Sequence, residues 1–307
     1  MHVLITGISG AIGRGVARRL VAAGHTVVGI DRRPWPDPPA GVVVYNADIR
    51  KRPAEDVFRN ERPDAMIHMA TVAGVTRNLD DRARINMVGT QRLLECCHEW
   101  GVRQVVFVGR HTVYGAAVDA PLYLTEDDPS LGGTTFPELA DLIAADLHAA
   151  SALWRYPEMT TSILRCVYTL GPSRRGTLAG YLAGPRVPMI LGFDPLFHFM
   201  HEEDVERAIV LALEHNLRGV YNVAGPQPLP LSSLIRRAGR TPVPMPGPLF
   251  RVLQGHAGFS SLSANAARHV MFPIVIDGSR FRAATGFEPL HDELNTVDAF
   301  RWSDRDA

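Results

Sequence analysis

The sequence predicts an α/β fold, with a doubly wound parallel sheet that carries helices on both faces and a small C-terminal lobe made of insertions. Short Val/Ile-rich runs alternate with longer helical patterns through the first half of the 307 residues, which is the βαβ rhythm of a parallel sheet. A glycine-rich turn, Gly7 to Gly13, directly follows the first apolar run. With 46% hydrophobic and 21% charged residues, the chain is long enough to bury a large core and a smaller one.

Six strands and three helices are predicted from the patterns of the first half. Runs rich in Val and Ile between Gly, Pro and Asp positions predict strands, at residues 2–6, 26–31, 42–45, 65–69, 104–108 and 161–167. Aliphatic residues at intervals of three and four predict helices, at residues 11–23, 84–100 and 138–154. Pro and Gly gather at residues 34–41 and 240–248, and we expect both segments to be surface loops.

The second half of the chain returns to the sheet before it completes the lobe. A helical pattern over residues 203–215 is followed by a strand pattern over residues 219–224. We therefore assign residues 1–170 and 197–224 to the sheet domain. The lobe is expected to consist of residues 171–196 and 225–307.

Charge and cysteine usage exclude several kinds of partner. The 32 basic and 32 acidic residues cancel, so the long-range field that attracts nucleic acid or an anionic membrane surface is missing. Cys96, Cys97 and Cys166 have no metal-ligand spacing, and we expect reduced thiols and no metal site. A strand pattern begins at residue 2 and no apolar run approaches the ~18 residues of a membrane span, so we expect a cytoplasmic protein.

The glycine-rich turn predicts a dinucleotide site. A strand that enters such a turn and then a helix presents backbone N–H groups and the positive helix end to a pyrophosphate. Gly7 permits the tight turn, Gly10 allows close approach, and Gly13 allows the helix to pack on the strand. Asp31 ends the second strand about 20 residues further on, where a carboxylate binds the ribose 2′-hydroxyl and repels a 2′-phosphate. This favours NAD, while the following Arg32 and Arg33 leave NADP possible, since they could hold a 2′-phosphate or simply be solvated loop arginines.

Segments along almost the whole chain resemble the extended short-chain dehydrogenase/reductase family of nucleotide-sugar epimerases and dehydratases. They are the glycine turn and residues 47–49, 64–70, 85–90, 113–115, 201–205, 221–225 and 277–280. The resemblance implies a Rossmann-type fold, bound NAD(P), a small-molecule substrate that is possibly a nucleotide sugar, and a homodimer formed through helices 84–100 and 138–154. The cofactor contacts that it implies fall on Gly7, Ser9, Gly10, Ala11, Ile12, Gly13, Asp31, Arg32, Asp48, Ile49, Met69, Ala70, Asn86 and Val108.

The catalytic tetrad of that family is incomplete in this sequence. Family members use a tyrosine activated by a lysine four residues later, but this chain has no Tyr-x-x-x-Lys and a single lysine, Lys51. Alignment places Arg110 at the usual Ser/Thr, Glu138 at the tyrosine and Leu142 at the lysine, and only Asn86 survives. A phenol with a pKa of ~10 needs a nearby cation to act as a base near neutral pH. The usual proton relay therefore cannot operate.

Other residues are candidates for the lost roles. Arg110 and His111 lie at the carboxyl end of a predicted strand, where doubly wound sheets bind ligands. Arg110 can hold a carboxylate or phosphate or polarise a carbonyl, and His111 can move protons near neutral pH. Tyr168 stands where the family often has Asn near the nicotinamide. Each of the three can equally fill space, and Glu138 fits a helix capping box with Thr135.

Three functions remain open on this evidence. The first is an enzyme of the epimerase/dehydratase type, an isomerase or oxidoreductase, with a rebuilt site around Arg110, His111 and Tyr168. The second is a dinucleotide-binding regulator or scaffold without turnover. The third is a redox-neutral isomerase or cyclase that acts on a small metabolite. We favour an enzyme, because the binding motifs extend into the lobe.

Overall fold

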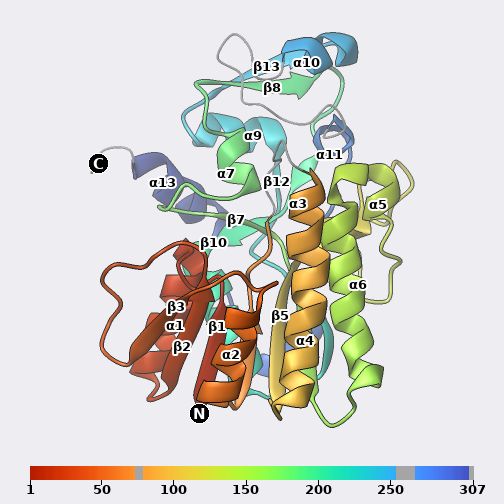
Figure 1. The fold of residues 1–307 in the computed structure, drawn as a ribbon. Helices are drawn as coiled ribbons and strands as arrows, with labels where there is room; N and C mark the ends of the chain where they lie inside the picture. The colour runs from red at the N-terminus through yellow and green to blue at the C-terminus, as the bar shows by residue number, and fades with distance from the viewer. Residues whose placement is uncertain (73–78, 254–266, 304–307) are drawn as a thin grey trace.

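The computed structural model describes residues 1–72, 79–253 and 267–303. A seven-stranded parallel sheet with the order β11-β6-β5-β4-β1-β2-β3 forms its centre (Figure 1). The strands are β1 His2–Thr6, β2 Thr26–Asp31, β3 Val42–Asn46, β4 Ala65–His68, β5 Gln104–Arg110, β6 Thr160–Cys166 and β11 Gly219–Val223. The predicted doubly wound parallel sheet is confirmed, including the strand that returns to it late in the chain.

Two helical layers cover the sheet. The first contains α1 Ala11–Ala22 and α8 Glu202–Glu214, which pack on each other. The second contains α2 Arg52–Glu61, α4 Thr90–Glu99 and α6 Ala140–Arg155, and in this layer α4 packs on both α2 and α6. Each layer buries its own apolar cluster against one face of the sheet. The α2 helix was not among the predicted elements.

The predicted helix 84–100 is interrupted at its beginning. Residues Arg84–Gly89 form a short π-helix, η1, which follows α3 Leu79–Ala83 and continues into α4. The wider π turn contains Asn86, whose amide is bonded to two other segments as described below. Single-turn π segments of this kind often occur at functional sites.

The lobe lies at one end of the sheet, at the top of Figure 1. Its helices are α7 Thr177–Tyr181, α9 Leu231–Arg237, α10 Gly247–Leu253, α11 Ala267–Met271 and α13 Glu293–Trp302, and a third apolar cluster joins them. Short strand pairs complete the lobe and its junction: β8 Arg186–Ile190 with β13 Thr241–Met245, β7 Tyr168–Leu170 with β10 Phe199–His201, and β9 Leu196–Phe197 with β12 Leu229–Pro230. The remaining elements are α5 Gly132–Thr135, α12 Ser279–Thr285 and two 3₁₀ turns, η2 His111–Tyr114 and η3 Pro137–Leu139.

The prediction of a surface loop at residues 240–248 is wrong, because strand β13 occupies most of that segment. The N–H of Thr241 and the carbonyl of Met245 form hydrogen bonds with the β8 segment, at 3.0 and 2.9 Å. Residues alternate along a strand, so Pro242 and Pro244 face away from β8 and need no N–H donor. Proline is tolerated on the free side of an edge strand for this reason.

The capping box expected at Thr135 and Glu138 is also absent. The Thr135 hydroxyl donates to the Gly132 carbonyl at 3.3 Å and belongs to α5. Helix α6 begins at Ala140, after a 3₁₀ turn that contains Glu138.

The division into two domains stays a prediction. Some of the residues assigned to the lobe, Ile274, Ile276, Phe281 and Phe287, pack in the same apolar cluster as β1 and α1. Among the helices that the structure describes, none has both the length and the apolar character required to cross a membrane.

Candidate active site

The glycine turn after β1 is shaped by contacts that only glycine allows. Gly7 has φ of +78° and its N–H donates to the Ile30 carbonyl at 2.8 Å. A Cβ on Gly7 would lie 3.0 Å from the backbone of Met69 and Ala70, and one on Gly13 would lie 2.5 Å from the Gly7 carbonyl oxygen. The turn therefore closes against Met69 and Ala70 at the end of β4, and the contact of these two residues with the cofactor stays a prediction.

The outer side of the same turn leaves little room for a side chain. A Cβ on Gly10 would lie 3.3 Å from the Gly7 carbonyl oxygen, which is a tight contact. Helix α1 begins at the next residues, Ala11 and Ile12, with neither a side-chain cap nor an acidic residue in its first turn. Its first N–H groups therefore have no side-chain acceptor, which is the condition for binding a phosphate at a helix N-terminus.

Asp31 is fixed beside this turn. Its side chain is 8% exposed, and its two oxygens accept hydrogen bonds from the N–H of Ser9 at 3.1 Å and of Arg33 at 2.9 Å. Oδ1 also accepts from Arg33 Nε at 3.5 Å, whereas Oδ2 keeps a lone pair for a ribose hydroxyl. Of the two arginines that the sequence offers for a 2′-phosphate, Arg32 and Arg33, the guanidinium of Arg33 lies against the turn, 3.7 Å from the Cβ position of Gly10.

Asp48 and Ile49 are held in place by neighbouring side chains. Arg50 donates to Asp48 at 2.6 and 2.9 Å and also reaches Asp81 at 2.6 Å. These hydrogen bonds lower the pKa of Asp48 to about 2. Ile49 packs closely on η1, because a Cβ on Gly89, the last residue of η1, would lie 2.5 Å from the Cδ1 atom of Ile49. The expected adenine-contacting turn is thus joined to the start of helix α4.

Asn86 braces the segment after β4 against helix α6. Its amide accepts from the Val72 N–H at 2.8 Å, donates to the Val72 carbonyl at 3.0 Å and donates to Asp141 at 2.7 Å. Arg82 pairs with Asp141 at 2.7 Å, and Arg82 also donates to the Glu138 carbonyl. All three polar side chains of this network are buried. Sequence reasoning missed Arg82 and Asp141, because a pair so far apart along the chain leaves no local pattern.

His68, at the end of β4, has both ring nitrogens occupied. Nδ1 lies 2.7 Å from the Thr6 hydroxyl and Nε2 lies 2.9 Å from the Thr90 hydroxyl. Because Thr90 donates its own proton to the Asn86 carbonyl at 2.6 Å, it accepts from His68, so the ring carries its proton on Nε2. Burial lowers the pKa of His68 to about 3. His68 therefore links two elements as a neutral ring.

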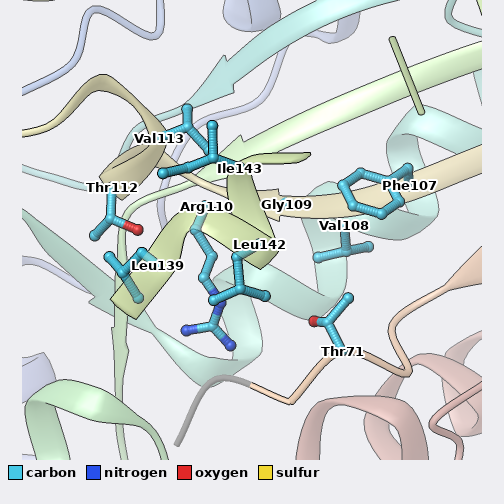
Figure 2. A pocket seen from close by; sticks show the side chains of 10 residues that line it. All are labelled: Thr71, Phe107, Val108, Gly109, Arg110, Thr112, Val113, Leu139, Leu142 and Ile143. Carbon is cyan, nitrogen blue, oxygen red and sulfur yellow. The ribbon is translucent and has the colours of Figure 1, made fainter. Parts of the chain in front are cut away.

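Arg110 enters a cavity at the carboxyl end of β5 (Figure 2). Its half-buried side chain extends between Leu139 and Leu142 toward Thr71, and Val108 lines the same cavity. In the part of the chain that the structure describes, its guanidinium has no hydrogen-bond acceptor and no carboxylate within ion-pair distance. Burial lowers the pKa of this guanidinium. Leu142, aligned with the family lysine, is 8% exposed and forms an apolar wall.

The structure brings His111 and Tyr168 next to Arg110. The two rings meet edge to face, with centroids 4.5 Å apart. His111 is 1% exposed; its Nδ1 lies 3.2 Å from the Cys166 carbonyl, and its Nε2 has no partner among the described residues. Burial lowers the pKa of His111 to about 3 and raises that of Tyr168 to about 12. Both shifts move the pKa away from neutral pH, and the proton-shuttling role of His111 stays a prediction.

Two further histidines beside this group were not predicted. His198 and His269 are buried, and burial lowers the pKa of each to about 4. Both are close enough to His111 that their positive charges would lower its pKa. They come from segments of the lobe and its junction, and no spacing in the sequence connects them with His111.

Comparison with known proteins identifies one family model and several related sequences. The model of the NAD dependent epimerase/dehydratase family matches residues 3–224. An uncharacterized protein of Mycobacterium tuberculosis is 32% identical over 264 residues, which cover 83% of this chain and 68% of that protein. A 3-diazoavenalumate denitrifying reductase of a Streptomyces species is 26% identical over 316 residues, covering 95% and 97% of the two chains.

Solved structures share the fold. The UDP-glucose 4-epimerase of Thermus thermophilus, determined with NAD, superimposes with a TM-score of 0.79 at 22% identity, and the match covers 100% of both chains. At that identity the likeness concerns the fold alone. The family model covers well over half of the residues and includes the glycine turn and Arg110. The chain therefore belongs to the NAD dependent epimerase/dehydratase family.

Proposed function

We propose that the protein is an NAD-binding enzyme that moves hydride to or from a small anionic substrate held by Arg110, without the Tyr/Lys relay of its family. The observation that carries this proposal is the Arg110 guanidinium, which enters a cavity at the ligand-binding edge of the sheet and meets no described carboxylate there. A partly buried charge without a partner costs stability. A ligand carboxylate or phosphate would remove that cost.

The residues around the glycine turn fit NAD. The uncapped start of α1 would hold the pyrophosphate, and Asp31 would bind the adenosine ribose diol. The turn formed by Asp48 and Ile49 would face the adenine, and Val108 would lie toward the nicotinamide. Bound NAD would supply an acceptor or donor of hydride. Arg33 beside Gly10 keeps NADP as the second choice of cofactor.

The chemistry left to this chain is electrostatic. Arg110 would orient the substrate and stabilise negative charge that develops on it, as a fixed cation does in a site with little water. His111 and Tyr168 would position the substrate, because neither exchanges a proton near neutral pH. A proton required by the reaction would come from solvent. The name of the Streptomyces relative is that of a reductase, which is consistent with hydride transfer in a chain of this kind.

Burial moves the pKa values of His111 and Tyr168, the described titratable neighbours of Arg110, away from neutral pH, which also favours a second candidate. A dinucleotide-binding regulator, or an isomerase or cyclase in which the cofactor is idle, needs no proton relay. Deuterium at the nicotinamide C4 separates these functions from ours. Transfer of the label to product supports hydride chemistry, whereas turnover without transfer supports the idle cofactor, and binding without turnover supports the regulator.

The test begins with the ligands released from freshly purified protein, identified by mass spectrometry with a nicotinamide absorbance scan. We expect NAD(H) and an anionic metabolite. Arg110→Ala should keep the nucleotide and lose the metabolite. The matched control is Arg103→Ala, because Arg103 is an exposed arginine that pairs with Asp64 at 2.7 Å. Equal loss of the metabolite in both variants, or retention in both, contradicts the proposal.

We also propose that the protein is a homodimer, paired through η1, α4 and α6. Large apolar side chains remain exposed on these elements: Met87 at 45%, Val88 at 50%, Leu147 at 51% and Trp154 at 77%. Burying them against a second copy would remove an unfavourable apolar surface. Light scattering on Trp154→Arg should show a shift toward monomer, and an unchanged mass would place any interface elsewhere.

A further inference from the structure

Two histidines and a glutamate from distant segments meet where helix α8 begins. His201 ends β10, Glu203 lies in the first turn of α8, and His291 lies in the segment before α13. One ring nitrogen of each histidine and one carboxylate oxygen lie within 4.8 Å of one another. Imidazole nitrogen and carboxylate oxygen are, with thiolate, the donors that bind Zn²⁺ in proteins. The three residues therefore form a candidate zinc site, which shares no residue with the glycine turn or the Arg110 cavity.

The spacing of the three donors is close to that of a zinc site. Nε2 of His291 lies 3.0 Å from Oε2 of Glu203, and the two imidazole rings have centroids 3.9 Å apart. Donors about 2.1 Å from a tetrahedral ion lie about 3.4 Å apart, so each remaining pair of donors, now within 4.8 Å, must approach by at most about 1.4 Å. Glu203 and His291 are half-buried, so their side chains can make this movement without displacing the fully buried core.

Neighbouring hydrogen bonds orient the carboxylate and the second histidine. Arg19 donates to Oε1 of Glu203 at 2.8 Å, which leaves Oε2 for His291. The backbone N–H of His291 donates to Asp204 at 3.2 Å, and this holds the backbone of His291 against the start of α8. Metal ligands in proteins are commonly oriented by such outer hydrogen bonds. Arg19 also pairs with Glu206 at 3.1 Å, so two carboxylates compensate its positive charge.

His201 exchanges one hydrogen bond for a metal bond when it binds an ion. Its Nδ1 accepts the N–H of Glu203 at 3.1 Å and so caps helix α8. A neutral imidazole has a single nitrogen lone pair, so coordination through either nitrogen replaces this cap. Burial lowers the pKa of His201, which keeps protons from occupying the lone pair at neutral pH. The cost of coordination is therefore one helix cap.

We propose that His201, Glu203 and His291 bind one Zn²⁺ ion, with water as the fourth ligand. Because His201 and Glu203 stand at the start of α8 and His291 stands just before α13, the ion fastens the C-terminal segment to α8. Two nitrogen donors select zinc over Mg²⁺ and Ca²⁺, which take oxygen ligands. The site is independent of the proposed function, since neither hydride transfer nor anion binding at Arg110 requires it.

Calorimetry on the untagged full chain, freed of metal by a chelator and dialysed, tests the proposal. ZnCl₂ is the probe and MgCl₂ its counterpart. We expect one Zn²⁺ per chain and no binding of Mg²⁺ at the same concentration. Zinc should also raise the midpoint of thermal unfolding, because it binds the folded chain. Absence of zinc binding, or equal binding of both ions, overturns the proposal.

Two variants locate the ion. His201→Asn removes the ring but keeps a residue type that caps helices well, and His291→Ala removes the second ring. Each should weaken zinc binding by more than about tenfold, because loss of even an outer hydrogen-bonding partner costs about 10–100-fold in metal affinity. The control is His25→Ala, because His25 lies 3.1 Å from the terminal amine and offers an alternative pair of donors. Unchanged affinity in His201→Asn and His291→Ala, or its loss in His25→Ala, contradicts the proposed site.

Discussion

Replacing Arg110 with methionine should stabilise the protein in the absence of ligands while it removes anion binding. Arg110 is half-buried and meets no described carboxylate, so folding moves its charge out of water without compensation. Burying an uncompensated polar group costs about 1–3 kcal/mol in protein mutants, and partial exposure reduces this to about 1 kcal/mol. Methionine keeps a flexible apolar chain between Leu139 and Leu142, so the packing changes little. The midpoint of thermal unfolding should rise by about 2 °C.

Urea unfolding of ligand-free protein measures this effect directly. The control is Arg103→Met, which removes an exposed arginine from a surface ion pair and should change the free energy of unfolding by less than about 1 kcal/mol. Stabilisation by Arg110→Met with loss of ligand binding would identify a residue kept for function at a cost in stability. If the variant is instead destabilised by more than the control, Arg110 is a structural residue and the proposed site is wrong.

Three other perturbations test the fold around the site. Gly13→Ala should abolish NADH binding and cost about 1–3 kcal/mol, because its Cβ would collide with backbone; Gly180→Ala, with no described atom within 4 Å of its Cβ, should do neither. His68 is neutral in the folded protein, with a pKa of about 3, so unfolding takes up a proton below the unfolded-state value of ~6.5. The contribution of His68 to stability is complete above that pH and falls by up to about 1.4 kcal/mol per unit below it. His111, His198 and His269 add to the same loss, so His68→Gln should make the slope shallower by up to that amount; an unchanged slope would contradict the assignment. Asp146→Ala leaves Arg165 buried without its partner at 2.7 Å and should cost about 3–5 kcal/mol, whereas Asp146→Leu with Arg165→Met should cost far less in the same urea assay.

The sequence predicted the sheet well because each buried parallel strand is a short run of branched residues, a signal that depends on neighbours only. The prediction failed where the position of a segment in the folded protein decided its structure. Pro242 and Pro244 indicate a loop unless one knows that their strand lies at an edge. Helix α2 was overlooked although Pro53 stands in its first turn and Val57 and Phe58 are buried, so the pattern contained a usable signal.

In the site, too, local features could be predicted from the sequence and features that depend on distant segments could not. The cofactor turn is local, and the glycine spacing together with its strand context and Asp31 was enough to predict residues from Gly7 to Asp31 as cofactor contacts. The surroundings of Arg110 come from distant segments, and no spacing in the sequence could have placed His269 near His111. Burial, which sets the pKa of both histidines, is likewise a property of the folded chain. Sequence reasoning could therefore name His111 but could not predict that its ring stays neutral.

The contrast between Arg82 and Arg110 explains why an arginine in this region is not by itself evidence for a ligand. Arg82 is 3% exposed, and Asp141 and the Glu138 carbonyl accept its hydrogen bonds, so its charge is compensated within the protein. Arg110 has no such compensation among the described residues, yet its guanidinium stays in a cavity where an apolar side chain would fit. A charge that the fold does not need, and that lowers stability, persists when something outside the chain pairs with it. If Arg110→Met proves as active as the wild type and more stable, that reasoning fails for this protein.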